Sequence, residues 1–251
     1  MQLMLRCVCL ASVALLCLAA PTLTPPRTLQ VTVRYPASNL QPSSALFLRG
    51  DACGLSWTRG VLLNKLSAPE DSWAVALTCD GAAAGDMISM KVLIDDSAWS
   101  LGCNMRAAAT GHAVLYPWFF SANGHYVYIP DVYSPQLGNS RDIVVYLPPS
   151  YSENTLKSVP NVLVMHDGQN LFNDSTSAFG CWHCDLTADA NIIAGAVEEL
   201  AIVGVDNSAE RTNELTYSYD ASQGAGGKGD KYLDFIERTV LPAVTSRFRI
   251  Q

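Results

Sequence analysis

Two apolar runs in the C-terminal half end in polar segments that are suited to binding a small molecule. The run at 161–165 leads into HDGQN at 166–170, and a second apolar run leads into Asp206 and Asn207. Ligands of open α/β sheets bind beyond the carboxyl ends of the strands, where such segments meet. Gly168 has no side chain, so the backbone can approach a ligand closely there. We therefore predict a ligand site at these strand ends.

The sequences around these segments resemble a known hydrolase family. "SRDIVVYLPPSY" at 140–151 and "VLVMHDGQNLF" at 162–172 are similar to the esterase D and enterochelin-esterase branch of the α/β-hydrolases, the putative-esterase family. The resemblance runs from about Tyr116 to Gln251. It implies a doubly wound α/β sheet and the hydrolysis of a small-molecule carboxylic ester by serine acyl transfer.

The resemblance also implies roles for individual residues. The loop after the third strand supplies a backbone N–H to the oxyanion of the tetrahedral intermediate, which makes Gly168 and Gln169 the candidates. A simple tight turn at Asp-Gly is the alternative. Arg211 and Tyr217, with Tyr219 nearby, are candidates for contacting the substrate, and ordinary loop residues are the alternative for them. The identity of the ester is not predicted.

The nucleophile of this chemistry has a signature that the sequence does not contain. A Gly-x-Ser-x-Gly turn lifts the serine above the sheet, and an acid and a histidine follow it. Glycines four apart occur only at 50/54 and 81/85, where the middle residues are Ala52 and Ala83. The resemblance places the turn beyond Gln251. We therefore expect no catalytic residue in this chain and no esterase activity from it alone.

The N-terminal half carries a spaced set of tryptophans and polar residues. RGDACGLSW at 49–57 is followed by Trp73, Lys91, Trp99 and Asn104. This order resembles the glucoamylase-type starch-binding module, although Leu-Ser-Trp replaces the Leu-Gly-x-Trp of that module. The resemblance implies an immunoglobulin-like sandwich that binds starch or another glycan.

Carried over position by position, Trp57 and Trp99 form the sugar-stacking pair. An indole can cover the apolar C–H face of a glucose ring with a large rigid surface. Lys91 and Asn104 then provide polar contacts to hydroxyl groups, and Trp73 belongs to the core. The alternative is a glycogen-binding-like sandwich that only packs on the hydrolase.

Cysteine and histidine residues raise two other chemistries. Cys181 and Cys184 have thioredoxin-like spacing, but they do not open a helix after a strand in the expected unit. A zinc site needs more ligands than His183 and these thiols supply. We predict a local disulfide or two free thiols there, no metal and no cofactor. Among the five cysteines after residue 20, four can form two bridges.

Composition limits the partners and the compartment. The 251 residues are 49% hydrophobic with a net charge of −7 and no basic cluster, so a nucleic-acid partner is excluded. Arg6, the apolar segment 7–18 and the small residues Ala19 and Ala20 have the order of a signal peptide. We expect a secreted or lumenal protein without a stable membrane span; an N-terminal membrane anchor is the alternative.

The predicted organisation is two domains after the targeting segment. They are an all-β immunoglobulin-like sandwich and an incomplete α/β-hydrolase. The boundaries are a signal peptide at 1–20, a proline-rich leader at 21–28, the sandwich at 29–110 and the N-terminal part of the esterase domain at 111–251.

Alternating and continuous apolar runs predict the elements that position the candidate residues. Strands are expected at 29–33, 45–48, 73–77, 88–94, 126–129, 142–147, 161–165 and 201–205. Helices are expected at 186–200 and at 230–248, and Pro242 predicts a break in the second one near 238–241.

Two functions fit these patterns. The first is a secreted esterase-family hydrolase with a starch- or glycan-binding front module. The second is a non-catalytic carbohydrate-binding protein. A Gly-x-Ser-x-Gly sequence encoded downstream of Gln251 would distinguish them in favour of the first.

Overall fold

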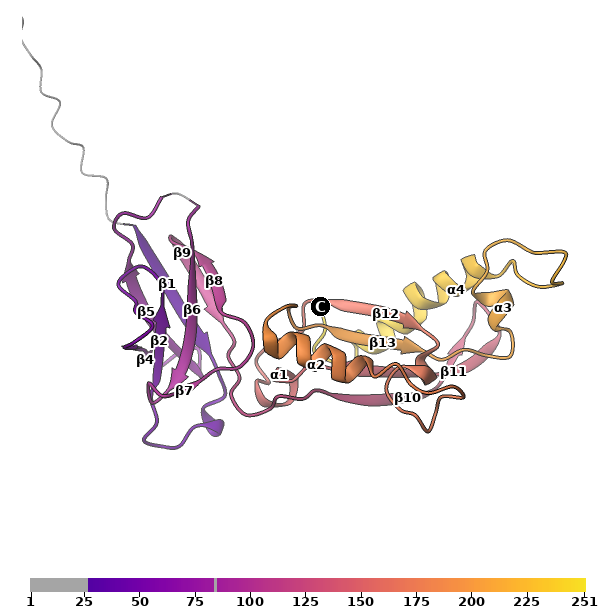
Figure 1. Cartoon of the computed structure of the whole chain (residues 1–251), viewed down its shortest axis with the longest axis horizontal. Helices are drawn as coiled ribbons and strands as arrows, with labels where there is room; N and C mark the ends of the chain where they lie inside the picture. The colour runs from indigo at the N-terminus through magenta and orange to yellow at the C-terminus, as the bar shows by residue number, and fades with distance from the viewer. Residues whose placement is uncertain (1–26, 84) are drawn as a thin grey trace, which may run out of the picture.

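The computed structural model describes residues 27–83 and 85–251. The predicted signal peptide at 1–20 and most of the predicted leader at 21–28 lie outside the described residues. A β-sandwich and an α/β unit follow one another along the chain (Figure 1). No helix in the described part of the chain combines the length and apolar character needed to cross a membrane.

Two facing sheets share one core in the front part of the chain. Their orders are β4-β5-β1-β9 and β3-β2-β6-β7, with β8 also paired to β6. The predicted strands at 29–33, 45–48, 73–77 and 88–94 are all present. The strands are β1 (Thr28–Arg34), β2 (Leu46–Gly50), β3 (Val61–Leu62), β4 (Asn64–Lys65), β5 (Ser72–Thr78), β6 (Met87–Ile94), β7 (Ala98–Trp99), β8 (Met105–Ala108) and β9 (Gly111–Leu115).

Alternation of side chains fills the sandwich core. Val31 and Val33 of β1 are buried between the sheets together with Met90 and Val92 of β6. Successive residues of a strand point to opposite faces, so the residues between them face outward. The sandwich therefore has a dry interior and an accessible outer face on each sheet.

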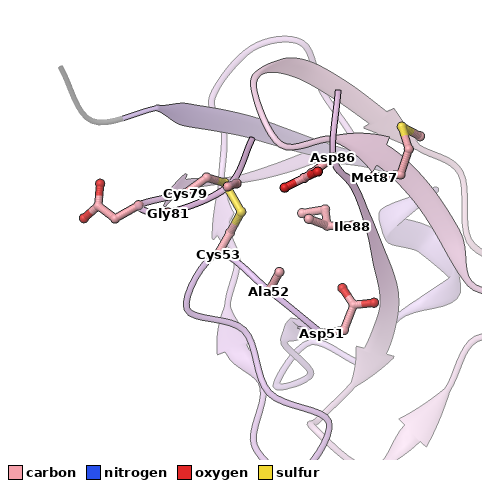
Figure 2. A pocket seen from close by; sticks show the side chains of 10 residues that line it. Asp51, Ala52, Cys53, Cys79, Gly81, Asp86, Met87 and Ile88 are labelled. Atoms are coloured by element: carbon pink, nitrogen blue, oxygen red, sulfur yellow. A yellow bond between two sulfur atoms is a disulfide. The ribbon is translucent and has the colours of Figure 1, made fainter. Parts of the chain in front are cut away.

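A disulfide joins Cys53 to Cys79 at one end of the sandwich. Figure 2 shows it beside an open hollow of about 640 Å³ whose lining includes Asp51 and Asp86. Both carboxylates already accept backbone hydrogen bonds, Asp51 from Ser89 N and Asp86 from the N–H of residue 83. The acidic groups of this hollow therefore stabilise turns of the sandwich.

The sandwich extends further along the chain than the predicted boundary at residue 110. β9 pairs in parallel with β1, and Leu115 lies opposite Val33. Leu115 is 5% exposed and belongs to the sandwich core. The boundary therefore lies after Leu115, because a parallel strand distant in sequence closes this sheet edge.

A third sheet, in the order β10-β11-β13-β12, forms the centre of the C-terminal part. β11 runs antiparallel to both of its neighbours, and β12 and β13 run parallel. The order matches an α/β sheet whose first two strands form a hairpin. The strands are β10 (His125–Ser134), β11 (Asn139–Leu147), β12 (Val162–His166) and β13 (Ala201–Val205).

Helices cover opposite faces of this sheet (Figure 1). Ile143 and Val145 of β11 pack with Phe235 of α4 in one core cluster, whereas Val144 packs with Ile192 of α2 in another. Side chains alternate between the faces of a strand, so β11 contributes to both clusters. The remaining helices are α1 (Ser150–Glu153), α3 (Arg211–Glu214) and the 3₁₀ segments η1 (Ala37–Asn39) and η2 (Gly168–Asn170).

The buried face of α2 (Cys184–Ala194) differs from the one that the apolar periodicity of the sequence predicts, which contains Leu186, Ala190, Ile193, Val197 and Leu200. Leu186 is 58% exposed, whereas Asp189 is buried beside Ile192. Oδ1 of Asp189 accepts hydrogen bonds from Tyr146 OH and Gly124 N, each at 2.7 Å. Because a buried carboxylate is tolerated when such donors satisfy it, a polar residue lies on the face that apolar periodicity assigned to solvent.

The length of α2 also departs from the prediction of 186–200. The helix ends at Ala194, and the following Gly195 has a φ of 72°, in the left-handed region that commonly follows a helix. The segment predicted at 230–248 contains the expected interruption. α4 (Gly229–Phe235), the π-helical η3 (Ile236–Val240) and α5 (Leu241–Thr245) follow one another, and Pro242 lies in the first turn of α5.

Two residues at the end of α1 connect the sandwich to the C-terminal part of the chain. Glu153 Oε1 accepts hydrogen bonds from Tyr35 OH at 2.8 Å and Phe119 N at 2.7 Å. Asn154 Nδ2 donates to the backbone oxygen of Arg34 at 3.0 Å. These side chains hold the two parts in contact.

Candidate active site

The strand ends that the sequence singled out meet at one edge of the sheet. β12 and β13 are parallel neighbours, and His166 lies opposite Val205. Gly168 is in contact with the following strand, since a Cβ on it would lie 2.6 Å from Asp206 Oδ1 and 2.7 Å from the carbonyl carbon of Gly204. A side chain at Gly168 would therefore push the loop away from β13.

Gln169 lies in η2, directly after this close contact. Its side-chain Oε1 accepts a hydrogen bond from Asn207 N at 3.2 Å, and its backbone oxygen accepts one from Thr176 Oγ1 at 2.7 Å. The backbone N–H of Gln169 has no acceptor among the residues that the structure describes. An N–H held in place without a partner has the property that an oxyanion donor needs.

An ion pair braces the loop from the other side. Asp167 has a left-handed backbone with φ of 54°, and Arg211 donates to its two carboxylate oxygens at 2.7 and 2.6 Å. These hydrogen bonds lower the pKa of Asp167. Burial of the carboxylate opposes this lowering, and a hydrogen bond from the side-chain amide of Asn207 adds to it. Arg211, predicted to contact substrate, is engaged with Asp167. Tyr217 and Tyr219 are 76% and 64% exposed.

Asp206 is a half-buried carboxylate that the sequence indicates only as a polar residue at a strand end. Its Oδ1 has no hydrogen-bond partner within the described residues. Burial and then the negative charge of Asp142 raise its pKa from 3.8 to about 6, against the opposing charge of Arg141. A carboxyl group with a raised pKa at a strand end is typical of functional sites. The sequence shows that Asp206 follows an apolar strand, but it does not show that Oδ1 of this side chain is buried.

We predict that Asp206 makes stability depend on pH. Its pKa is higher in the folded state, so its contribution to stability is full below about pH 4 and is lost as the pH rises through about 6. Asp206→Asn should remove this loss. The melting temperature of the variant relative to the unaltered protein should therefore increase between pH 4 and 7.

Asp142→Asn is the matched control for this titration. Removal of the neighbouring charge should lower the midpoint of Asp206 in a carboxyl NMR titration without abolishing it. A midpoint for Asp206 near its ordinary value in the unaltered protein would contradict the assignment.

A separate cluster lies on the outer face of the five-stranded sheet. Trp57 and Trp99 have ring centroids 6.3 Å apart and an interplanar angle of 31°. They are 36% and 42% exposed, whereas Trp73 is 5% exposed in the core. The structure thus brings together the two tryptophans that the sequence paired and buries the third.

Arg49 holds the two rings in position. Its guanidinium carbon lies 5.1 Å from the ring centroid of Trp99, and its Nη1 donates to the backbone oxygen of Trp57 at 3.0 Å. An ion pair with Asp96 at 2.8 Å fixes the same guanidinium. Arg49 was not predicted as a site residue, although it opens the segment RGDACGLSW that ends at Trp57.

Lys91 and Asn104 are the two residues predicted to make polar contacts with a sugar. Lys91 shares the face of Trp99, but its ammonium donates to the backbone oxygen of Gly102. Burial lowers the pKa of Lys91. Asn104 is exposed and lines a hollow of about 520 Å³ with Trp118, and neither Trp57 nor Trp99 belongs to that lining. A sugar contact by Asn104 therefore stays a prediction.

A family model matches the C-terminal part of the chain. The family described as Putative esterase matches residues 134–251, a segment that contains Gly168, Gln169, Arg211 and Asp206. The match does not include the sandwich. No curated protein matches the chain.

Solved structures that resemble this one include several hydrolases. An IroE-like serine hydrolase from Shewanella oneidensis is 22% identical with a TM-score of 0.39, over 50% of this chain and 40% of that one. The BES protein from Bacillus cereus is 19% identical with a TM-score of 0.37, over 53% and 49%. A ferulic acid esterase from Anaeromyces mucronatus is 18% identical with a TM-score of 0.37, over 51% and 45%.

The chain thus spans less than half the length of each of these three structures. Because the identities and TM-scores are low, the likeness carries no conclusion about activity.

Proposed function

We propose that this chain joins a glycan-binding front sandwich to the oxyanion side of a secreted carboxylic-ester hydrolase. The exposed pair Trp57 and Trp99 is the observation that carries the glycan-binding part. Two adjacent exposed indoles form a flat apolar surface that matches the C–H faces of sugar rings. The tilt of 31° between the rings suits a curved chain such as an α-glucan or a cyclodextrin.

Preorganisation supports the same assignment. Arg49 is paired with Asp96 and lies over the ring of Trp99. Side chains that are already fixed lose little conformational entropy when a ligand binds. The remaining hydrogen-bonding capacity of Lys91 provides a donor on the same face of β6. The surface therefore supplies two stacking platforms and a cation for hydroxyl groups.

The esterase part of the proposal rests on the loop after β12. The free N–H of Gln169 and the backbone approach at Gly168 fit a donor to the oxyanion of an ester undergoing acyl transfer. No Gly-x-Ser-x-Gly sequence that could present the nucleophile occurs among these 251 residues. The disulfide between Cys53 and Cys79 supports secretion, because such bonds persist in oxidising compartments.

We predict that Trp57→Ala and Trp99→Ala each weaken binding of β-cyclodextrin by about 5- to 30-fold. This corresponds to about 1–2 kcal/mol for loss of one stacked ring. Isothermal titration of the full chain gives the dissociation constants. Trp182→Ala is the matched control, since Trp182 is 59% exposed but lies outside the sandwich. It should leave the affinity unchanged.

Absence of binding to β-cyclodextrin and to soluble starch by the unaltered chain would overturn the glycan proposal. So would equal loss of affinity in all three variants. Circular dichroism of each variant establishes that the fold is retained.

A second experiment separates the hydrolase from a non-catalytic glycan-binding protein. A fluorophosphonate probe reacts with the activated serine of a serine hydrolase. The protein isolated from its native source should be labelled, and an ester substrate should protect it. An unlabelled native protein that still binds β-cyclodextrin would favour the non-catalytic alternative.

A further inference from the structure

The loop between η2 and α2 brings three different ligating side chains together. Cys181 Sγ lies 3.1 Å from His183 Nδ1, and His183 Nε2 lies 4.0 Å from Asp174 Oδ2. One ligand atom from each of the three residues lies within 4.8 Å of the others. The sequence predicted no metal here, because Asp174 is seven residues from Cys181 and only folding shows it as a third ligand.

The backbone holds this cluster in place. Trp182 N donates to Asn170 O at 2.8 Å, and Cys184 N donates to Leu171 O at 3.0 Å. Cys181 N also donates to Asp174 Oδ1 at 2.8 Å. The side chains therefore gather on a loop that is fixed at both ends.

We propose that Asp174, Cys181 and His183 bind Zn²⁺ or a divalent metal of similar softness. Thiolate, imidazole and carboxylate are the three ligand types that zinc takes in proteins. Zn–S and Zn–N bonds of about 2.3 and 2.0 Å imply a sulfur-to-nitrogen separation of about 3.5 Å in a tetrahedron. The observed 3.1 Å needs only a small adjustment of the exposed His183 and the half-buried Cys181.

The exposure of the cluster defines the kind of site. The side chains of His183 and Asp174 are 52% and 67% exposed. Three protein ligands at the surface leave one tetrahedral position for water or for a ligand from solution. One aspartate and one thiolate balance the charge of a divalent ion.

The competing use of Cys181 is a disulfide with Cys184. Both thiols are free in this structure, in which Cys53 and Cys79 are joined. Cys181 is directed to the imidazole of His183, which favours metal coordination over pairing with Cys184. The proposal is independent of the esterase and glycan assignments, because none of its three ligands belongs to either surface.

Titration of the full chain with Co²⁺ and then Zn²⁺ tests the site. One Co²⁺ per chain should produce a thiolate-to-cobalt charge-transfer band, and Zn²⁺ should displace it. Cys181→Ser should remove the band, and His183→Ala should weaken zinc binding about 100-fold or more, since even changes behind the ligands cost 10- to 100-fold. Cys103→Ser removes the exposed free thiol of the sandwich and should change neither result.

Cys184→Ser is the decisive control, because it prevents the local disulfide and removes none of the three ligands. The variant should bind Zn²⁺ as well as the unaltered chain. The proposal is overturned if the band is missing in both proteins, or if the Cys181→Ser and His183→Ala variants bind normally. It is also overturned if thiol counting without reductant shows Cys181 joined to Cys184. Unchanged melting temperatures establish that the variants are folded.

Discussion

Glu214→Ala is expected to lower the free energy of unfolding by about 3–5 kcal/mol, the cost of leaving one member of a buried ion pair without its partner. The carboxylate of Glu214 forms two hydrogen bonds with the guanidinium of Arg141, at 2.8 and 3.0 Å. Both side chains are 2% exposed. Burial opposes the charge of Glu214, but hydrogen bonds from Arg141 and Asn139 lower its pKa on balance.

The position of this pair explains why the site depends on it. Arg141 comes from β11 and Glu214 from α3, in the segment that follows β13. The guanidinium also lies 5.2 Å from the ring centroid of Phe235 in α4. Without Glu214, the charge of Arg141 would be buried among aromatic rings. Helix α3, which begins at Arg211 and ends at Glu214, would then lose its anchor.

Urea denaturation of the full chain measures the effect. Glu210→Ala is the matched surface control, because the Glu210–Lys228 pair is 47% and 40% exposed and its loss should have a much smaller effect. The double variant Arg141→Met, Glu214→Met should recover much of the loss, since it removes both buried charges. A loss below about 1 kcal/mol for Glu214→Ala would contradict the buried geometry.

Trp73→Ala should destabilise the sandwich by about 3–5 kcal/mol, as for other aromatic-to-alanine changes in a core. Trp73 lies opposite Val33 in β1, and both side chains belong to the sandwich core. Truncation leaves a cavity that neighbours such as Val31 cannot fill.

Denaturation of Trp73→Ala and Trp99→Ala under the same conditions separates a core tryptophan from a surface one. Trp99 is 42% exposed, so its removal should have the smaller effect on stability and the larger effect on binding. Trp73→Phe should retain part of the lost stability. Equal destabilisation by the two alanine variants would contradict the proposed division of roles.

Strand positions were predictable because each strand has a strong local pattern. β13 (Ala201–Val205) matches its predicted range, since a continuous apolar run suits a strand buried on both faces. The break before α5 was predictable from Pro242, because proline disrupts the preceding helical hydrogen bonds. The parallel pairing of β9 with β1 was not, since no local pattern specifies a partner about 80 residues away.

The candidate sites divide in the same way. The loop at Gly168 was predictable from the polar segment that follows an apolar run, and the pairing of Trp57 with Trp99 was implied by the resemblance to the starch-binding module. The ion pair of Arg211 with Asp167 and the burial of Asp206 arise from the meeting of β12 and β13. Such contacts join segments distant in sequence, so composition and periodicity carry no signal for them.

The most direct test of the glycan-binding assignment follows the five indole N–H signals of the chain by NMR during titration with β-cyclodextrin. These signals come from Trp57, Trp73, Trp99, Trp118 and Trp182. The signals of Trp57 and Trp99 should shift together with one dissociation constant, while the other three remain in place. No shift at about 10 mM ligand, or shifts confined to Trp118 and Trp182, would contradict the account.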